Sequence, residues 1–170
     1  MIRQPDNLSD DERAAWAQAA DHFHRAYRRQ MEGDFASAIR DYKISLRIFR
    51  TCEAHTFLAW VYSFLKLYEL AIAECRLAIE VDPDFGNPYN DIGVYLMELD
   101  RPAEAIPWLR QATVAPRYDA RVYAYYNLGR VFERLGDLTS AEMAYRDALS
   151  VDPLYGQALH ALQRLLGSFN

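Results

Sequence analysis

Residues 122–155, VYAYYNLGRVFERLGDLTSAEMAYRDALSVDPLY, decide the fold. The first half of this stretch carries an apolar stripe at helical spacing, formed by Leu128, Gly129 and Phe132. The second half carries another stripe, formed by Ala141, Tyr145 and Ala148. Gly136-Asp137 breaks the helix between the stripes, and Asp152-Pro153 ends the second helix. We therefore expect two short helices that fold back on each other.

The small residues of the stripes determine how closely the two helices approach. Gly129, Ala141 and Ala148 carry almost no side chain, so the two backbones can lie close together. Phe132 and Tyr145 fill the space that remains.

The same template occurs three more times towards the N-terminus, with a period of about thirty-four residues. The small residue of the first helix is Ala26, Ala59, Gly93 and Gly129. The first alanine of the second helix is Ala38, Ala71, Ala105 and Ala141. The bulky residue that follows is Tyr42, Cys75, Leu109 and Tyr145, and the late small residue is Ser45, Ala78, Ala112 and Ala148.

This spacing, with its Leu-Gly pair, Gly-Asp turn, alanine pair and closing proline, resembles the tetratricopeptide repeat over about residues 18 to 155. The resemblance implies an all-α fold, a right-handed superhelical α-solenoid of four helix-turn-helix units plus a C-terminal capping helix. We expect a disordered N-terminus at residues 1–8 and one domain at 9–170. The repeats are expected at about 19–51, 52–85, 86–119 and 122–155, and the capping helix at about 156–167.

The two ends of this array have their own signals. Ser9 with Glu12 three residues later predicts a capping box, so the first helix should begin near Asp10. In the capping helix, the predicted apolar stripe consists of Leu159, Leu162 and Leu166.

Repeats 1 and 3 depart from the pattern. Arg25 and Arg29 stand where repeat 1 should have an apolar pair. A first helix shifted by one residue is the alternative, with Phe23, Tyr27 and Gln30 facing inward. In repeat 3, Pro107 lies within the second helix, and the spacing between Ala115 and Val122 is about two residues longer than in the other repeats. We expect a kink and a loosened junction there.

Composition excludes several classes of function. The net charge is −5 and the longest basic run is Arg28-Arg29, so a nucleic-acid partner is not expected. The most apolar stretch, residues 57–65, is too short to span a bilayer, which excludes membrane insertion. Residues 1–18 lack the apolar core of a signal peptide, and Cys52 and Cys75 lie in different helices that the repeat does not oppose. A cytoplasmic location follows.

Catalytic and metal-binding patterns are absent from the sequence. No CxxC, HExxH, GxGxxG or GxxxxGK pattern occurs, and the four histidines, His22, His24, His55 and His160, form no ligand set. We therefore expect no enzyme activity, no cofactor and no metal.

The resemblance to the family implies a concave groove, lined by the first helix of each repeat, that receives a peptide. The candidate peptide-binding residues are Tyr27, Trp60, Phe64, Asn90, Val94, Met97, Tyr123, Tyr126, Asn127, Arg130 and Arg164. Aromatic side chains at helical spacing also have an interpretation as core residues. As a groove, this surface is aromatic at its start and polar and cationic at its end. It predicts a partner segment that is apolar or aromatic with an acidic end.

One subfamily of these repeats grips the C-terminal carboxylate of heat-shock chaperones with lysine, asparagine and arginine at set positions. In this chain those positions hold Phe23, Tyr27, Phe57, Asn87 and Asp91, or, from repeat 2 onward, Thr56, Trp60, Asp91, Tyr123 and Asn127. We expect no such carboxylate clamp.

The predicted function is a non-enzymatic adaptor or scaffold that binds a protein segment. Two alternatives remain open at this stage. The chain could be a chaperone for a secreted or assembly client, since small acidic repeat proteins of similar length have that role. It could also be a structural or regulatory subunit that uses its convex face or forms a homodimer through Trp60 and Phe64.

Overall fold

The computed structural model describes residues 2–167. Over this range it contains nine α-helices and, apart from one isolated β-bridge, no strand. The chain forms two compact units, Met1–Pro83 and Asp84–Asn170, which are called unit 1 and unit 2 below. The prediction of all-α structure is confirmed, whereas a single domain with superhelical handedness stays a prediction.

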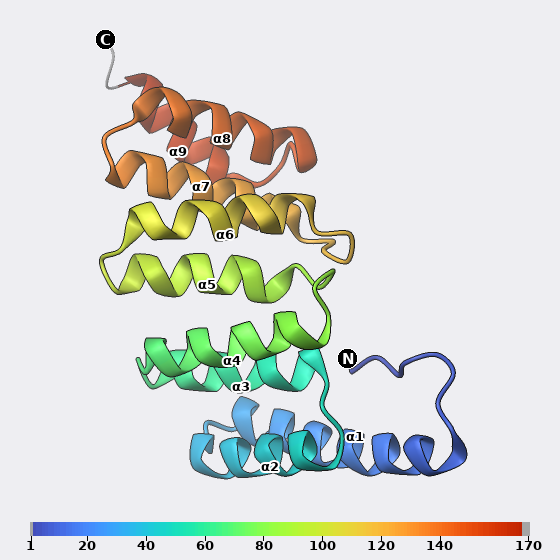
Figure 1. The fold of residues 1–170 in the computed structure, drawn as a ribbon. Helices are drawn as coiled ribbons and strands as arrows, with labels where there is room; N and C mark the ends of the chain where they lie inside the picture. The colour runs from blue at the N-terminus through green and yellow to red at the C-terminus, as the bar shows by residue number, and fades with distance from the viewer. Residues whose placement is uncertain (1, 168–170) are drawn as a thin grey trace. The chain divides into compact units, whose positions relative to one another are not determined.

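Unit 1 consists of two helix pairs (Figure 1). The bounds of its helices are α1 Asp10–Met31, α2 Phe35–Ile48, α3 Cys52–Phe64 and α4 Tyr68–Val81. Each first helix packs against the second helix of its own repeat, and α2 also packs against α3. Residues 2–8 precede α1 without helical structure, and Ile2 is buried.

Unit 2 contains two further pairs and a last helix. Its helices are α5 Asn87–Glu98, α6 Pro102–Val114, α7 Arg121–Arg134, α8 Leu138–Val151 and α9 Gly156–Gly167. The first helices of the two repeats, α5 and α7, contact each other, and α9 packs on α8. The two pairs of unit 2 span residues 87–114 and 121–151.

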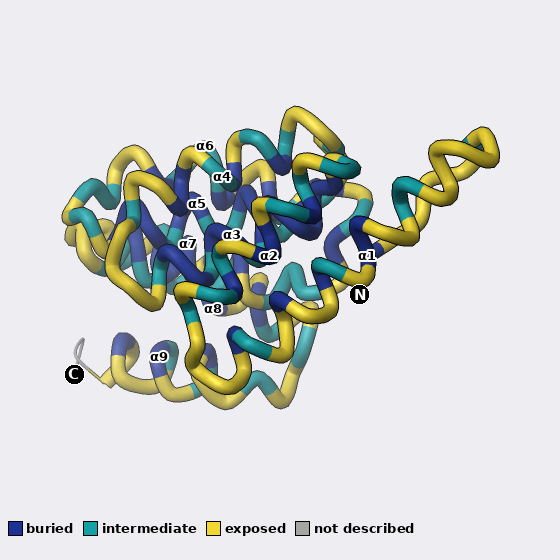
Figure 2. The backbone as a smooth tube through the Cα atoms, turned by 90° about the horizontal axis from the view of Figure 1, so that it is seen from below, coloured by how far each residue is buried: buried dark blue, intermediate teal, exposed yellow. Residues whose placement is uncertain are grey.

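The first helix begins where the sequence predicts. Ser9 and Glu12 form both hydrogen bonds of a capping box, and Asp10 is the first helical residue. The first turns of α1 are exposed, whereas its second half carries buried residues (Figure 2). Thus α1 extends beyond the repeat, and its buried residues begin at Ala19.

Close helix approach at the small positions is confirmed in both repeats of unit 2. A Cβ atom added to Gly93 would lie 2.4 Å from Cγ of Leu109, and one added to Gly129 would lie 2.3 Å from Cε1 of Tyr145. In each pair the bulky residue of the second helix therefore occupies the volume that the glycine leaves empty.

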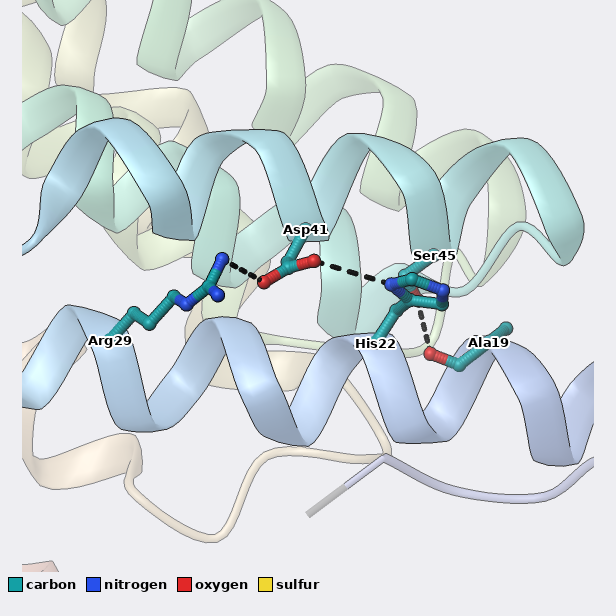
Figure 3. A network of polar contacts seen from close by, with 5 residues as sticks. All are labelled: Ala19, His22, Arg29, Asp41 and Ser45. Carbon is teal, nitrogen blue, oxygen red and sulfur yellow. Dashed lines mark hydrogen bonds and ion pairs between the residues drawn. The ribbon is translucent and has the colours of Figure 1, made fainter.

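Repeat 1 replaces an apolar contact by a polar network between α1 and α2 (Figure 3). Asp41 on α2 is buried and contacts two residues of α1, with Arg29 Nη1 at 2.6 Å and His22 Nδ1 at 3.3 Å. One turn further, Ser45 Oγ donates to the Ala19 carbonyl at 2.8 Å. A buried carboxylate of this kind is tolerated because two partners compensate its lost hydration.

Neither of the two registers considered for α1 is correct for every residue. Phe23 and Gln30 are buried, and Gln30 accepts a hydrogen bond from Tyr42 at 2.7 Å. Tyr27, however, is 41% exposed, so its inward placement in the shifted register is wrong. Arg29 reaches α2 through its guanidinium, which explains why an arginine is accepted at an apolar position.

Backbone hydrogen bonds join the connection after α6 to residues 84–86. The Arg117 amide donates to the Asp84 carbonyl at 2.9 Å, and the Gly86 amide donates to the Arg117 carbonyl at 3.1 Å. Tyr118 is buried, and a Cβ atom on Gly86 would lie 2.3 Å from its Cβ. The longer connection thus forms an ordered contact with residues 84–86 at the start of unit 2. The helix α6 continues through Pro107.

The capping helix is rotated by about one residue from its predicted register. Its buried residues are Ala158, Ala161 and Leu165. The predicted stripe is therefore wrong, since Leu166 is exposed and Leu159 and Leu162 are only half-buried. The physical reason is that alanines let α9 approach α8 more closely than leucines would, as at the other helix pairs.

Candidate functional site

The predicted peptide-binding residues lie on the first helix of each repeat, except Arg164 on the capping helix α9. Unit 1 carries Tyr27 on α1 and both Trp60 and Phe64 on α3, and the other eight belong to unit 2.

In unit 1, Phe57 joins two of the predicted aromatic residues, Tyr27 and Trp60, into one cluster. Its ring centroid lies 5.6 Å from that of Tyr27, 4.6 Å from that of Trp60 and 5.2 Å from that of the buried Phe23. We call Tyr27, Phe57, Trp60 and Phe64 the aromatic surface. Sequence reasoning did not select Phe57 as a binding residue. Its signal was its place on α3, three residues before Trp60.

The aromatic surface is accessible yet supported from below. Tyr27 is 41% and Phe64 is 58% exposed, while Phe57 and Trp60 are half-buried. Phe64 stacks on Phe35 of α2, with centroids 5.6 Å apart and planes 18° apart. Edge-to-face and stacked rings restrict one another's rotation, so the surface is preorganised for an apolar ligand.

In unit 2, a row of amides and a guanidinium links α5 to α7. The Asn127 side chain donates to Asn90 Oδ1 at 3.0 Å, and Arg130 donates to Asn127 Oδ1 at 3.1 Å. Asn127 is buried, whereas Asn90 and Arg130 are half-buried. We call Asn90, Asn127 and Arg130 the amide row. It fixes the orientation of Arg130 and leaves the other donors of its guanidinium for a ligand.

Tyrosines flank the amide row. Tyr155 makes edge-to-face contacts with Tyr123 and Tyr126, at centroid distances of 5.6 and 5.5 Å. The Arg130 guanidinium lies 5.9 Å from the Tyr126 ring centroid. Burial raises the pKa of Tyr155 to about 12, so its hydroxyl stays protonated at neutral pH. Tyr155 was not among the predicted residues, because it follows the closing Pro153 and lies outside both helices of repeat 4.

Arg164 is engaged within unit 2. Its Nη2 atom lies 2.8 Å from Glu133 Oε2, and the Tyr145 hydroxyl donates to the same carboxylate. Burial disfavours ionisation of Glu133, but the hydrogen bonds from Arg164 and Tyr145 outweigh it and lower the pKa of this carboxyl. A ligand of Arg164 would therefore have to share the guanidinium with Glu133.

Two predicted residues offer little surface. Met97 is only 4% exposed, and its carbonyl accepts a hydrogen bond from Arg134 at 2.9 Å. Val94 is half-buried. The role of Met97 in binding stays a prediction, and it would require this side chain to move.

Among residues 2–167, no three His, Cys, Asp or Glu side chains are grouped so that they could hold a metal ion. Over the same range, no helix combines the length and apolar character needed to cross a membrane. Cys52 and Cys75 are both buried thiols.

Comparison with known proteins identifies two of the repeats. Residues 53–85 and 122–153 match the model of the tetratricopeptide repeat. Over 88 residues, the chain is 34% identical to protein O-mannosyl-transferase Tmtc3 of Drosophila melanogaster. The matched segment covers 51% of this chain and 9% of that protein. The chain thus spans less than a tenth of that relative's length.

Solved structures share the fold. The structure of Pseudomonas aeruginosa pilF matches with a TM-score of 0.82 and 23% identity, over 90% of this chain and 70% of that one. A crystal structure of MamA matches with a TM-score of 0.74 and 24% identity, over 86% of this chain and 80% of that one. The helix pairs before and between the two matched segments follow the same period, so the chain has the fold of the tetratricopeptide repeat, which serves as a scaffold for protein–protein interaction.

Proposed function

We propose that this chain is a non-enzymatic adaptor that binds a peptide segment of a partner protein through the first helices of its repeats. These helices are predicted to line a concave groove. The observation that carries the proposal is the aromatic surface of unit 1, where the exposed rings of Tyr27 and Phe64 contact the half-buried rings of Phe57 and Phe35.

The aromatic surface favours an apolar or aromatic segment of the partner. Each buried ring of the ligand would contribute about 1–3 kcal/mol by removing apolar area from water. The rings of Tyr27 and Phe64 already contact neighbours, so little rotational freedom is lost on binding.

The amide row of unit 2 favours polar atoms of a partner. Asn90 and Arg130 offer hydrogen bonds to backbone carbonyls and to an acidic side chain or chain end. Tyr123 and Tyr126 add aromatic contact area beside them. Because an unstructured peptide must be ordered on binding, we expect a dissociation constant in about the micromolar range, on the order of −8 kcal/mol.

A matched pair of tryptophan substitutions tests the adaptor proposal. Trp60 lies on a first helix and Trp108 lies on the second helix α6, and both are half-buried. Partners are captured from native cells with the unmodified chain, then titrated against Trp60→Ala and Trp108→Ala. We expect Trp60→Ala to weaken binding about tenfold or more through faster dissociation, and Trp108→Ala to leave it within about twofold.

Equal losses in the two variants, or an effect of Trp108→Ala alone, would show that the partner uses another surface. Circular dichroism melting curves of both variants check that each remains folded. Tyr126→Ala provides the corresponding substitution in unit 2.

Self-association is the second candidate function, and it rests on exposed apolar residues at the turn between α3 and α4. These residues are Phe64, Leu65, Leu67 and Leu70. A surface of this kind also suits a chaperone that shields an apolar client. Light scattering across protein concentration separates the alternatives, because a homodimer through Phe64 doubles the mass at high concentration and Phe64→Glu abolishes the increase.

We further propose that the chain acts in the cytoplasm and catalyses no reaction itself. The two buried thiols suit a reducing compartment. Cell fractionation of the native protein tests the location.

A further inference from the structure

Unit 1 contains a second feature, separate from the aromatic surface, in a cleft of about 270 Å³ between α2, α3 and α4. It is lined by Lys43, Leu46, Arg47, Arg50, His55, Leu58 and Glu74. On α3, His55 and Phe57 are two residues apart and therefore point about 200° away from each other. The cleft and the aromatic surface thus occupy different faces of the same helix.

The lining of the cleft is cationic in a chain whose net charge is −5. It includes two arginines and a lysine against a single carboxylate, Glu74. Arg50 lies 3.8 Å from Glu80, outside the lining. Among residues 2–167, no carboxylate pairs with Lys43 or Arg47, and Lys43 lies over the Tyr62 ring at 5.8 Å. The cleft therefore has positive charge available for an anion.

His55 adds a buried polar group to this cationic lining. It is 5% exposed, and its Nδ1 lies 2.7 Å from Glu74 Oε2. Its other ring nitrogen, Nε2, is buried and has no hydrogen-bond partner among the described residues. When Nδ1–H donates to Glu74, Nε2 carries a hydrogen only in the imidazolium form, and in that form it is a donor that lacks an acceptor. A buried polar group of this kind is uncommon in folded proteins and needs an explanation.

We propose that the cleft binds a phosphate monoester. Lys43 and Arg47, which pair with no carboxylate among the described residues, match a ligand of about −1.5 to −2 charges better than a carboxylate of one charge. Arg47 and Lys43, one helical turn apart, hold the phosphate oxygens, and His55 Nε2 donates to one of them from the interior. Nε2 is shielded from solvent, so the exposed long side chains of Lys43 and Arg47 rotate to admit the ligand.

The phosphate could be carried by a partner protein or by a small molecule, and both present the same group to the cleft. The site goes beyond the proposed adaptor role, because its residues differ from those of the aromatic surface. Phosphate binding can therefore be absent while Trp60→Ala still weakens partner capture. Equally, the cleft can bind phosphate while Trp60→Ala has no effect on partner capture.

The test uses the whole chain and inorganic phosphate, with sodium chloride added to keep the ionic strength constant. Histidine ring signals are followed by nuclear magnetic resonance, and the chain has four histidines to compare. We expect the His55 signals to shift in a saturable way while those of His24 and His160 do not. Acetate at the same ionic strength should bind about tenfold more weakly or not at all.

Two arginine substitutions on α2 provide the matched comparison. Arg47 lines the cleft, whereas Arg40 is exposed on the same helix and does not. We expect Arg47→Gln to weaken phosphate binding about tenfold and Arg40→Gln to leave it within about twofold. Equal effects of the two variants, or binding that leaves the His55 signals in place, would overturn the proposal in favour of a general ionic effect.

A second comparison identifies the source of the phosphate. A glycine-flanked phosphoserine pentapeptide is titrated beside glycerol 3-phosphate. Tighter binding of the peptide supports a phosphorylated partner protein, and equal or weaker binding supports a small phosphate ester. Loss of binding to both would overturn the proposal.

Discussion

At the scale of single residues, the fold depends on positions where a side chain would occupy volume already filled by a neighbour. Gly129 leaves space for the Tyr145 ring, and Gly93 leaves space for Leu109. The corresponding positions of unit 1, Ala26 and Ala59, are fully buried alanines. Whether a methyl group fits at these positions therefore depends on the bulk of the opposing side chain.

Gly129→Ala should lower the free energy of unfolding by about 1–3 kcal/mol. The added Cβ would lie 2.3 Å from the Tyr145 ring, which is itself buried and cannot rotate away without moving α8. Thermal or urea unfolding measures the loss. Gly156→Ala is the matched control, since nothing lies within 4 Å of its Cβ. A Gly129→Ala variant as stable as the parent chain would contradict the packing described here.

At the scale of elements, the segment after α6 shows how a longer connection can be ordered. The extra length before α7 allows Arg117 to pair with residues 84–86 and buries Tyr118 against Gly86. Sequence reasoning predicted a weak point here, from Pro107 and the longer spacing. The backbone hydrogen bonds of the connection oppose that expectation for residues 115–118, while Pro107 still lacks an amide donor within α6.

Tyr118→Ala should destabilise the fold by about 3–5 kcal/mol, because it removes a buried aromatic side chain. Hydrogen exchange at the Gly86 and Arg117 amides should accelerate in the variant. Tyr123→Ala is the matched control, since that tyrosine is about half exposed and its loss should cost much less. Unchanged exchange at both amides in Tyr118→Ala would show that the connection does not depend on this side chain.

The contact between α9 and α7 should depend on pH. Glu133 has a pKa below its ordinary value of 4.5, where burial is outweighed by the hydrogen bonds from Arg164 and Tyr145. A carboxyl whose pKa is lowered by folding adds stability above the unfolded pKa, and that stability is lost as the pH falls through the folded pKa.

Arg164→Gln should therefore reduce stability at pH 7 by at most about 1 kcal/mol, since the guanidinium is largely exposed. The difference from the parent chain should shrink as the pH falls below 4.5 and Glu133 takes up its proton. Urea unfolding of both proteins from pH 7 to pH 3 measures this. A difference that stays constant over the range would exclude Glu133 as the partner responsible.

At the scale of the whole molecule, the two units expose different chemistry on equivalent helices. Unit 1 presents the aromatic surface, whereas unit 2 presents the amide row beside Tyr123 and Tyr126. The strength of apolar contacts comes from the area that they remove from water. Contacts to a guanidinium near solvent gain part of their strength from charge, which salt screens. Salt should therefore distinguish the contributions of the units to one partner.

Arg130→Glu should weaken partner binding mainly at low ionic strength, because charge interactions are screened beyond about 8–10 Å at physiological salt. Trp60→Ala should weaken binding at every salt concentration. Titrations from low to high sodium chloride measure both, and Arg146→Glu on α8 supplies the same charge change on a second helix. If neither Arg130→Glu nor Trp60→Ala changes the affinity for a partner, that partner binds to another face.

The repeats, their helices and their small positions could be predicted from sequence, because these depend on local spacing. An apolar period of 3.6 residues, a turn and a closing proline act over a few residues. The capping box at Ser9 and the close approach at Gly93 and Gly129 are of this kind. The all-α fold and the repeat pattern follow from them, and most candidate binding residues do lie on the first helices.

Tertiary packing alone decided which side chains remain accessible and which polar groups meet. The burial of Met97, the one-residue rotation of α9 and the exposure of Tyr27 depend on the shape of the neighbouring helix, which no single repeat encodes. The pairing of Asp41 with Arg29, and of Asn127 with Asn90, joins residues 12 and 37 positions apart. The cationic cleft around His55 likewise exists only because three helices bring its lining together. Helical periodicity gives each residue a face, but the partner of that face is determined by packing in three dimensions.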